Sequence, residues 1–125
     1  MWQEIGIKNF QAAQELYDGK HYRSSVSRFY YAAFSALTFE IARRGVVFPQ
    51  NRETPSHAQL PQLIVRHLTQ FSETRRGNIA RVTARLYRSR LDADYSLTRV
   101  DKRSAGDALR DAAAILEYLG VSYDA

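Results

Sequence analysis

The chain has 125 residues, of which 45% are hydrophobic and 25% charged, so one globular domain over residues 1–125 is predicted and two would not fit. The 18 Lys and Arg residues exceed the 13 Asp and Glu residues by five, and only Lys8, Lys20 and Lys102 are lysines. No cysteine is present, which excludes disulfides, thiolate metal sites and cysteine nucleophiles.

The N-terminal residues lack the basic start and apolar run of a secretory signal. No apolar stretch approaches the ~20 residues that cross a bilayer. We therefore expect a cytoplasmic protein without a membrane segment.

Periodicity predicts two helices in the first third of the chain. The first runs from Gln3 to Tyr17, and Gly19 suits its C-terminal turn; the second runs from His21 to Arg44 and stops at Gly45. The second helix is apolar around much of its girth. It therefore lies in the middle of a bundle, or its second face meets a partner chain.

Three further helices are predicted after a loop over residues 45–57. Ser56 and Gln59 have capping-box spacing and open the third, which runs to Phe71. The fourth begins between residues 74 and 78 and continues to Leu97. Ser104 caps the fifth, which Gly120 ends. The predicted fold class is all-α, an up-and-down bundle of four to five helices.

The basic excess is concentrated around the fourth helix. Residues 75–103 hold nine basic and three acidic residues, a local charge of +6. At about 100° per residue, one sector of this helix holds a set that we call the arginine face: Arg81, Arg85, Arg88, Asp92 and Tyr95. Apolar residues cluster on the opposite side and are predicted to form a core stripe of Ile79, Val82, Leu86, Ala93 and Leu97.

Two interpretations of the arginine face remain open. It is either a solvated surface with an Arg88–Asp92 ion pair, or a site for an anionic partner such as RNA or a nucleotide. We favour the second, because arginines one turn apart repel each other unless an anion lies near.

Other site chemistry finds no support. The three histidines are scattered, so no metal site is predicted, and no glycine-rich phosphate loop or dinucleotide fingerprint indicates a cofactor. The serines of the second helix have no histidine near them in sequence. Asp92 and Asp94 project about 160° apart and cannot act as a carboxylate pair.

Two segments, which run from Leu16 to Phe34 and from Leu86 to Tyr95, resemble the HEPN domain family. The first resembles the family's glycine-containing turn followed by a tyrosine pair, Tyr30-Tyr31, two alanines and an aromatic residue. The second is similar to a later helix with an arginine and an Ala-Asp-Tyr ending. The closing helix with its Ala112–Ala114 run also suits the family.

The resemblance implies a helical bundle that is usually a homodimer and often a metal-independent ribonuclease toxin paired with a small nucleotidyltransferase. The family's site has an arginine, a polar residue and a histidine, often with a tyrosine two residues further on. When the chain is aligned on Tyr95, these positions hold Arg88, Ser89 and Ala93, so the histidine is missing. Arg52 and His57 have the motif's spacing, but they lie in a proline-broken loop, and we interpret this as chance.

Three functions are weighed in order of preference. The first is a dimeric binding module, non-catalytic or weakly catalytic, that engages RNA, a nucleotide or a nucleotidyltransferase partner. The second is a metal-independent endoribonuclease centred on Arg88 with Asp92, Asp94 or Tyr95. The third is a repeat-like helical hairpin that binds proteins, although the expected recurrence after about 34 residues is absent.

Overall fold

The computed structural model describes residues 1–97 and 99–123. Within them it contains five α-helices, a single 3₁₀ turn and no strand, so the predicted all-α fold is confirmed. The elements are α1 (Trp2–Asp18), α2 (Tyr22–Ala42), η1 (Pro49–Asn51), α3 (Leu60–His67), α4 (Glu73–Tyr95) and α5 (Lys102–Tyr118).

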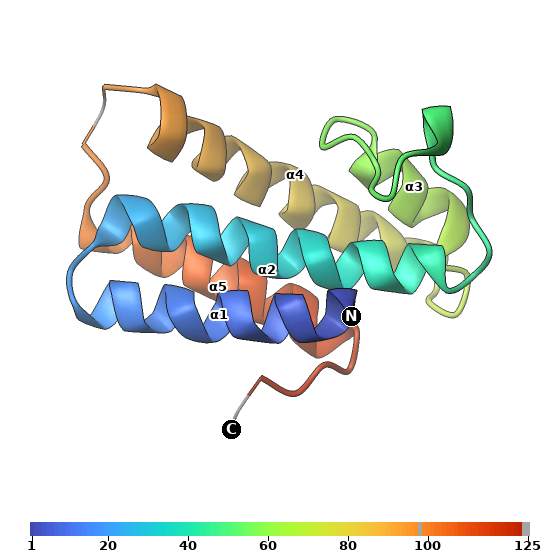
Figure 1. Cartoon of the computed structure of the whole chain (residues 1–125), viewed down its shortest axis with the longest axis horizontal. Helices are drawn as coiled ribbons and strands as arrows, with labels where there is room; N and C mark the ends of the chain where they lie inside the picture. The colour runs from blue at the N-terminus through green and yellow to red at the C-terminus, as the bar shows by residue number, and fades with distance from the viewer. Residues whose placement is uncertain (98, 124–125) are drawn as a thin grey trace.

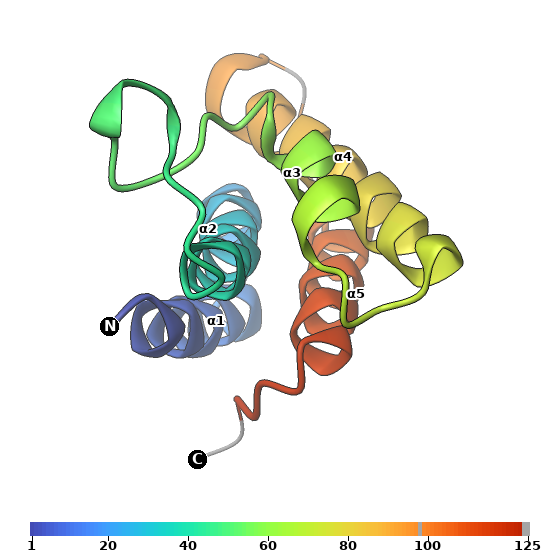
Figure 2. The same ribbon diagram turned by 90° about the vertical axis from the view of Figure 1, so that its right-hand side faces the viewer.

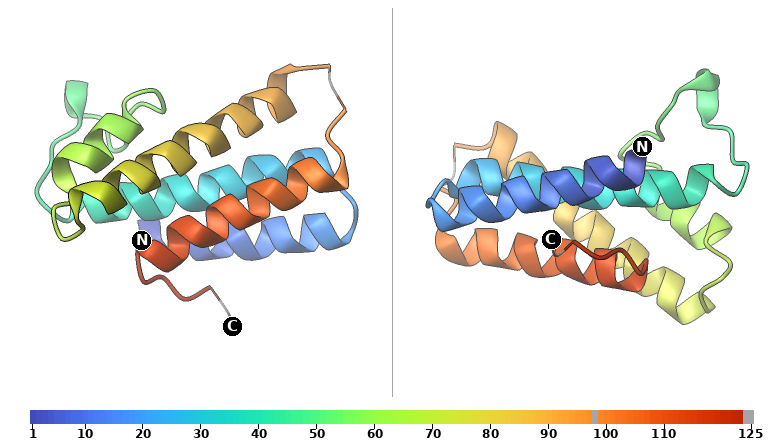
Figure 3. Two further views of the ribbon diagram at one scale, coloured as in Figure 1. Left: turned by 180° about the vertical axis from the view of Figure 1, so that it is seen from behind. Right: turned by 60° about the horizontal axis from the view of Figure 1, so that its bottom comes forward.

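α2 lies at the centre of the bundle and packs against each of the other four α-helices. α1 runs antiparallel beside it, and α4 crosses the bundle obliquely (Figure 1). Figure 3 shows α5 and α4 from behind, where both lie across α2. The central place explains the apolar girth of α2: Phe29 is fully buried and Phe34 is 6% exposed. The first of the two predicted alternatives is therefore correct, and these aromatic side chains do not call for a partner chain.

The backbones of α1 and α2 approach each other closely at Gly6. A Cβ atom there would lie 3.0 Å from the Ala32 carbonyl oxygen and 3.3 Å from the Ala36 amide nitrogen. Glycine lets the two helices touch along this line.

Helix ends differ from several predictions. α4 begins at Glu73 and is capped by Ser72, whose Oγ accepts a hydrogen bond from the Arg75 amide at 3.1 Å. It ends at Tyr95, so Leu97 is fully exposed and does not belong to the core stripe. α5 is capped by Asp101 rather than Ser104, because the Asp101 carboxylate accepts the Ser104 amide at 2.9 Å.

α3 is shorter than predicted. Ser56 Oγ does accept the Gln59 amide at 3.2 Å, but the helix starts at Leu60 and ends at His67, four residues before Phe71. The segment 43–59 that precedes it arches away from α2 in Figure 2. Buried Phe48 and Pro55 pin this segment to the bundle, and Gln50 has a positive φ of 59° at the turn.

None of the helices in the described part of the chain is long and apolar enough to span a membrane. The cytoplasmic location stays a prediction.

Candidate functional site

α4 carries arginines on two opposite faces. On the predicted arginine face, Arg81, Arg85, Arg88 and Asp92 are all exposed. On the far side Ile79, Leu86 and Ala93 are fully buried, and Val82 is half-buried. The predicted amphipathic phase of this helix is thus correct except at Leu97.

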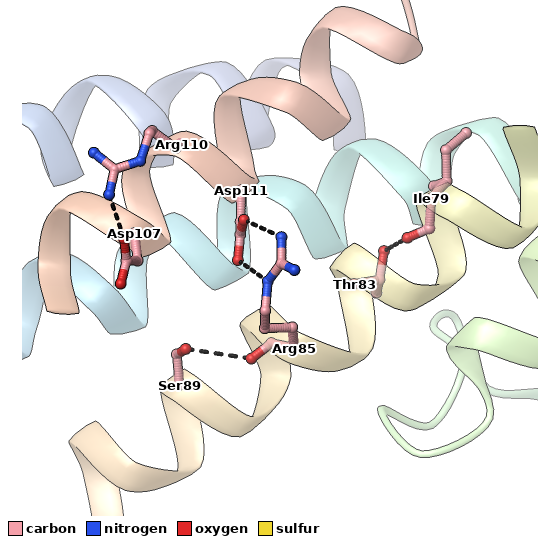
Figure 4. Close-up of polar contacts among 7 residues, drawn as sticks. All are labelled: Ile79, Thr83, Arg85, Ser89, Asp107, Arg110 and Asp111. Carbon is pink, nitrogen blue, oxygen red and sulfur yellow. Dashed lines mark hydrogen bonds and ion pairs between the residues drawn. The ribbon is translucent and has the colours of Figure 1, made fainter.

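The guanidinium of Arg85 is already paired within the protein and is not free to bind a ligand. Its Nε and Nη2 donate to the two carboxylate oxygens of Asp111 on α5, at 3.0 and 2.7 Å (Figure 4). This two-point contact raises the pKa of Arg85 above its ordinary value, chiefly through the hydrogen bond. Asp111 is only 8% exposed, so Arg85 offsets a carboxylate that would otherwise be buried alone. Its first role is structural.

The other members of the arginine face are less engaged. Arg81 Nη2 donates to Asn78 Oδ1 at 2.8 Å, which leaves most of its guanidinium available. Arg88 makes no hydrogen bond or ion pair with any residue that the structure describes. The Arg88–Asp92 pair of the solvated-surface interpretation is absent among those residues. Instead, the Asp92 and Ala93 carbonyl oxygens accept from Arg23 of α2.

The opposite face of α4 holds Arg90, which the sequence interpretation passed over. Its Nε lies 2.8 Å from Asp94 Oδ2, and its Nη2 donates to the Tyr31 hydroxyl at 3.0 Å. The guanidinium also lies over the Tyr31 and Tyr95 rings, 5.4 and 5.6 Å from their centres. Tyr95 therefore belongs with Arg90 rather than with the arginine face. Burial lowers the pKa of Arg90, but Tyr31, Asp94 and Tyr95 together raise it above its ordinary value.

His57, which belongs to the 43–59 segment, packs against the tyrosines near Arg90. Its Nδ1 is 2.7 Å from the Tyr30 hydroxyl, within hydrogen-bonding distance. Its ring stacks on Tyr87 of α4 at 5.5 Å and 11°, and it packs on Phe34 at 4.5 Å. We call Tyr30, Tyr31, His57, Tyr87 and Arg90 the aromatic cluster.

Burial sets the protonation of this cluster. Burial, and secondly the charge of Arg90, lower the pKa of His57, so the imidazole is neutral at pH 7. Burial also raises the pKa of Tyr30, which keeps its hydroxyl protonated. The structure thus brings a neutral imidazole close to a fixed guanidinium. Sequence analysis had considered the same pair of groups at Arg52 and His57 and interpreted their spacing as chance. The cation that sequence analysis missed was Arg90, which lies on α4 while His57 lies in a loop, and no spacing along the chain could have indicated it.

Among the described residues, no three His, Cys, Asp or Glu side chains come together as possible metal ligands. The groups described above are arginines, aromatic rings, one histidine and the carboxylates of Asp92, Asp94 and Asp111.

Comparison with known proteins gives one positive result. The family model of the HEPN domain matches residues 1–121, nearly the whole chain. The chain belongs to the HEPN family. Neither the curated proteins nor the solved structures contain a match.

Within this HEPN chain, the position expected for the motif histidine is buried, so a side chain there could not reach a substrate. Ala93 is fully buried, so even a histidine placed there would have to enter the core. Arg88 and Ser89 lie on the outer side of α4, and Ser89 Oγ donates to the Arg85 carbonyl oxygen at 3.2 Å. This helix thus presents exposed arginines on its outer side and has no proton carrier at the position of Ala93.

Proposed function

We propose that this HEPN chain is a binding module that holds RNA through the exposed arginines of α4, with little or no catalysis of its own. The observation that supports it best is Arg88, an exposed guanidinium with no described partner at the middle of a strongly basic segment. Arginine binds phosphate with two parallel hydrogen bonds, and an unpaired guanidinium gives up no internal contact when it does so.

The test is the salt dependence of RNA binding. Arg81→Ala with Arg88→Ala removes two cations that carry little structural duty, whereas Arg85→Ala would strand Asp111. Each lost phosphate contact on a single strand should reduce the slope of log K against log salt by about 0.7. Fluorescence anisotropy with a short labelled single-stranded RNA measures this slope.

The matched control is Arg44→Ala with Arg52→Ala, which removes the same charge from two exposed positions outside α4. If this pair weakens binding as much as the α4 pair, only net charge matters and the proposed face is wrong. If neither pair changes the slope, RNA binding does not use these arginines.

A small nucleotidyltransferase is a further proposed partner, on the strength of the family resemblance alone. Co-purification with the nucleotidyltransferase encoded beside it, if there is one, tests this directly. Loss of the complex at high salt would show that charged groups contribute to the contact.

Metal-independent RNA cleavage is the second candidate, and one observation favours it. The aromatic cluster brings neutral His57 into the same packed group as Arg90, a base and a cation of the kinds that 2′-hydroxyl attack requires. Cleavage of a structured RNA in the presence of EDTA should be lost in His57→Ala and kept in His67→Ala. Cleavage lost in Arg88→Ala and kept in His57→Ala would return the centre to Arg88.

A further inference from the structure

A cavity of about 670 Å³ lies between α1, α5 and the segment that follows α5. In the right-hand view of Figure 3, α1 and α5 lie side by side, and this segment turns back toward α1. No described residue of α4 lines the cavity, so it is separate from the arginine face. Its volume falls in the range of small-molecule sites, about 300–1,000 Å³.

α1 gives the cavity a wall of hydrogen-bond acceptors. Gln11, Gln14, Glu15 and Asp18 recur at helical spacing, so they share one face of α1, and all four line the cavity. Two of them are carboxylates and two are amides, and each carries a carbonyl or carboxylate oxygen that accepts hydrogen bonds. Gln11 is oriented by the segment after α5, because its Nε2 donates to the Tyr123 carbonyl oxygen at 3.2 Å.

The charge of this wall is opposite to that of the chain. The chain has a net charge of +5, yet no Lys, Arg or His of the described residues lines the cavity. Glu15 and Asp18 are exposed, and neither forms an ion pair within the part of the chain that the structure describes. Arg110 of α5 lies near Tyr17 but is paired with Asp107. The two carboxylates are therefore available to an external cation.

Helix stability does not explain the position of these acids. Glu15 and Asp18 stand in the last turn of α1, which holds no basic residue. The dipole of a helix favours cations at this end and disfavours carboxylates. Their presence beside a cavity is what a cation site would require.

Two rings and one aliphatic side chain complete the cavity: Tyr17, Leu109 and Tyr123, all half-buried. Tyr123 packs on Phe10 with ring centres 4.2 Å apart, and Tyr17 meets Tyr22 edge to face at 5.7 Å. The face of a tyrosine ring attracts an ammonium group, and an aliphatic side chain offers apolar contact to methylene groups. Rings and hydrocarbon suit an organic cation better than Mg²⁺, which prefers oxygen ligands and keeps its water.

We propose that this cavity binds an aliphatic polyamine, with two ammonium groups paired to Glu15 and Asp18 and the methylene chain lying along Leu109 and the tyrosine rings. Residues three apart on a helix are neighbours, with about 5–6 Å between their Cβ atoms. A polyamine carries its ammonium groups on short methylene chains, so one molecule can reach both carboxylates, whereas a monoamine cannot. The proposal goes beyond RNA binding by α4 and does not rest on it.

Isothermal titration calorimetry of the whole chain tests the proposal. The protein is first freed of nucleic acid, because RNA itself binds polyamines. It is then titrated with spermidine, with butylamine and with MgCl₂ at matched ionic strength. A polyamine site predicts saturable binding of spermidine and little binding of butylamine or Mg²⁺. No saturable binding of spermidine, or equally tight binding of Mg²⁺ or butylamine, overturns the proposal.

Variants then locate the contacts. Glu15→Gln with Asp18→Asn removes both charges and keeps the side-chain shapes, and it should weaken spermidine binding at least about fivefold. The matched control is Glu4→Gln with Glu53→Gln, the same charge change at two exposed positions outside the cavity, which should leave binding nearly unchanged. Equal weakening by both pairs would mean that only net charge matters and would contradict the site.

The contribution of the ring is tested at Tyr17. Tyr17→Leu should weaken spermidine binding, whereas Tyr17→Phe keeps the ring and should bind nearly as wild type. Because Glu15 and Asp18 are exposed, their double variant keeps the proposal testable even if Tyr17→Leu fails to fold. Equal binding by both Tyr17 variants would contradict the contact with this ring.

The two proposals fail separately. Replacing both Arg81 and Arg88 with Ala should leave the spermidine titration unchanged, since neither residue lines the cavity. A normal salt slope of RNA binding with no spermidine binding would leave RNA binding by α4 standing and remove the polyamine site alone.

Discussion

At the scale of single residues, His57 ties the 43–59 segment to the helices. The Tyr30 side chain is 1% exposed, and its hydroxyl has His57 as its hydrogen-bond partner. Leaving a buried hydroxyl without a partner costs about 1–3 kcal/mol. We therefore expect His57→Ala to lower the free energy of unfolding by about this amount, measured by urea denaturation.

Two variants give this prediction its controls. His67→Ala removes a half-buried histidine of α3 that has no ring contact or hydrogen bond with the aromatic cluster, and it should have a small effect. Tyr30→Phe removes the hydroxyl itself, so His57→Ala should cost less in that background. Equal losses in both backgrounds would show that the hydrogen bond contributes nothing.

His57 also predicts how stability depends on pH. Burial and Arg90 lower the pKa of His57 in the folded protein, while the unfolded chain keeps the ordinary value of 6.5. The titratable groups that face it are Tyr30, Tyr31, Tyr87 and Arg90; burial raises the pKa of Tyr30, and the pKa of Arg90 is raised as well, so Tyr30 stays neutral and Arg90 stays charged in this range. As the pH falls below about 6.5, the unfolded chain takes up a proton before the folded one, so stability decreases until the folded pKa is reached.

Urea unfolding at several pH values between about 7.5 and 5 measures this loss. The slope should be smaller in His57→Gln, which cannot titrate. An identical slope in both proteins would mean that other groups cause the pH dependence.

At the scale of the elements, α4 shows what sequence patterns can and cannot determine. Its amphipathic phase follows from apolar spacing, which a local rule reads correctly for Ile79, Leu86 and Ala93. The residue at which α4 ends does not follow from apolar spacing. Arg23 of α2 donates to the carbonyl oxygens of Ala93 and Ser96 and stabilises the C-terminus of α4 there. Arg23 lies about 70 residues away in the chain, so no local signal reports this contact.

Two glycines in helices predict opposite effects of one substitution. At Gly6 an added Cβ would press on the backbone of α2, and backbone cannot move aside as a flexible side chain can. At Gly77 of α4 nothing lies within 4 Å of the added atom. Gly77→Ala should stabilise the protein by about 0.5–1 kcal/mol, and Gly6→Ala should destabilise it despite the better helix propensity of alanine.

Thermal unfolding of the two variants beside the wild type tests the pair. Stabilisation by both substitutions would mean that α1 can shift away from α2 without cost. Such a result would contradict the close packing of the hairpin.

At the scale of the whole molecule, the number, type and order of the helices could be predicted because each carries its own apolar period and turn signals. The aromatic cluster could not. Tyr30, His57, Tyr87 and Arg90 come from two helices and a loop, and packing rather than spacing brings them together. The same limit applies to Arg85, which looks available on a helical wheel until α5 places Asp111 against it.

The last prediction concerns assembly. HEPN domains often dimerise, and we propose a homodimer here, although the buried aromatic residues of α2 no longer argue for it. The ground is now the end of α4, where Tyr95 is 74% exposed and Leu97 fully exposed. Neighbouring exposed apolar side chains commonly mark an interface. Gel filtration with light scattering should give about twice the chain mass of 14.3 kDa.

Leu97→Glu should shift this dimer to the monomer, because a carboxylate at a closed apolar contact loses its water without gaining a partner. Val47→Glu is the matched control: Val47 is 76% exposed in the 43–59 segment, outside α4, and the same substitution there should leave the dimer intact. If Val47→Glu dissociates the dimer and Leu97→Glu does not, the interface lies on the 43–59 segment. A wild-type chain that is monomeric at tens of micromolar would show that the exposed end of α4 has another partner or none.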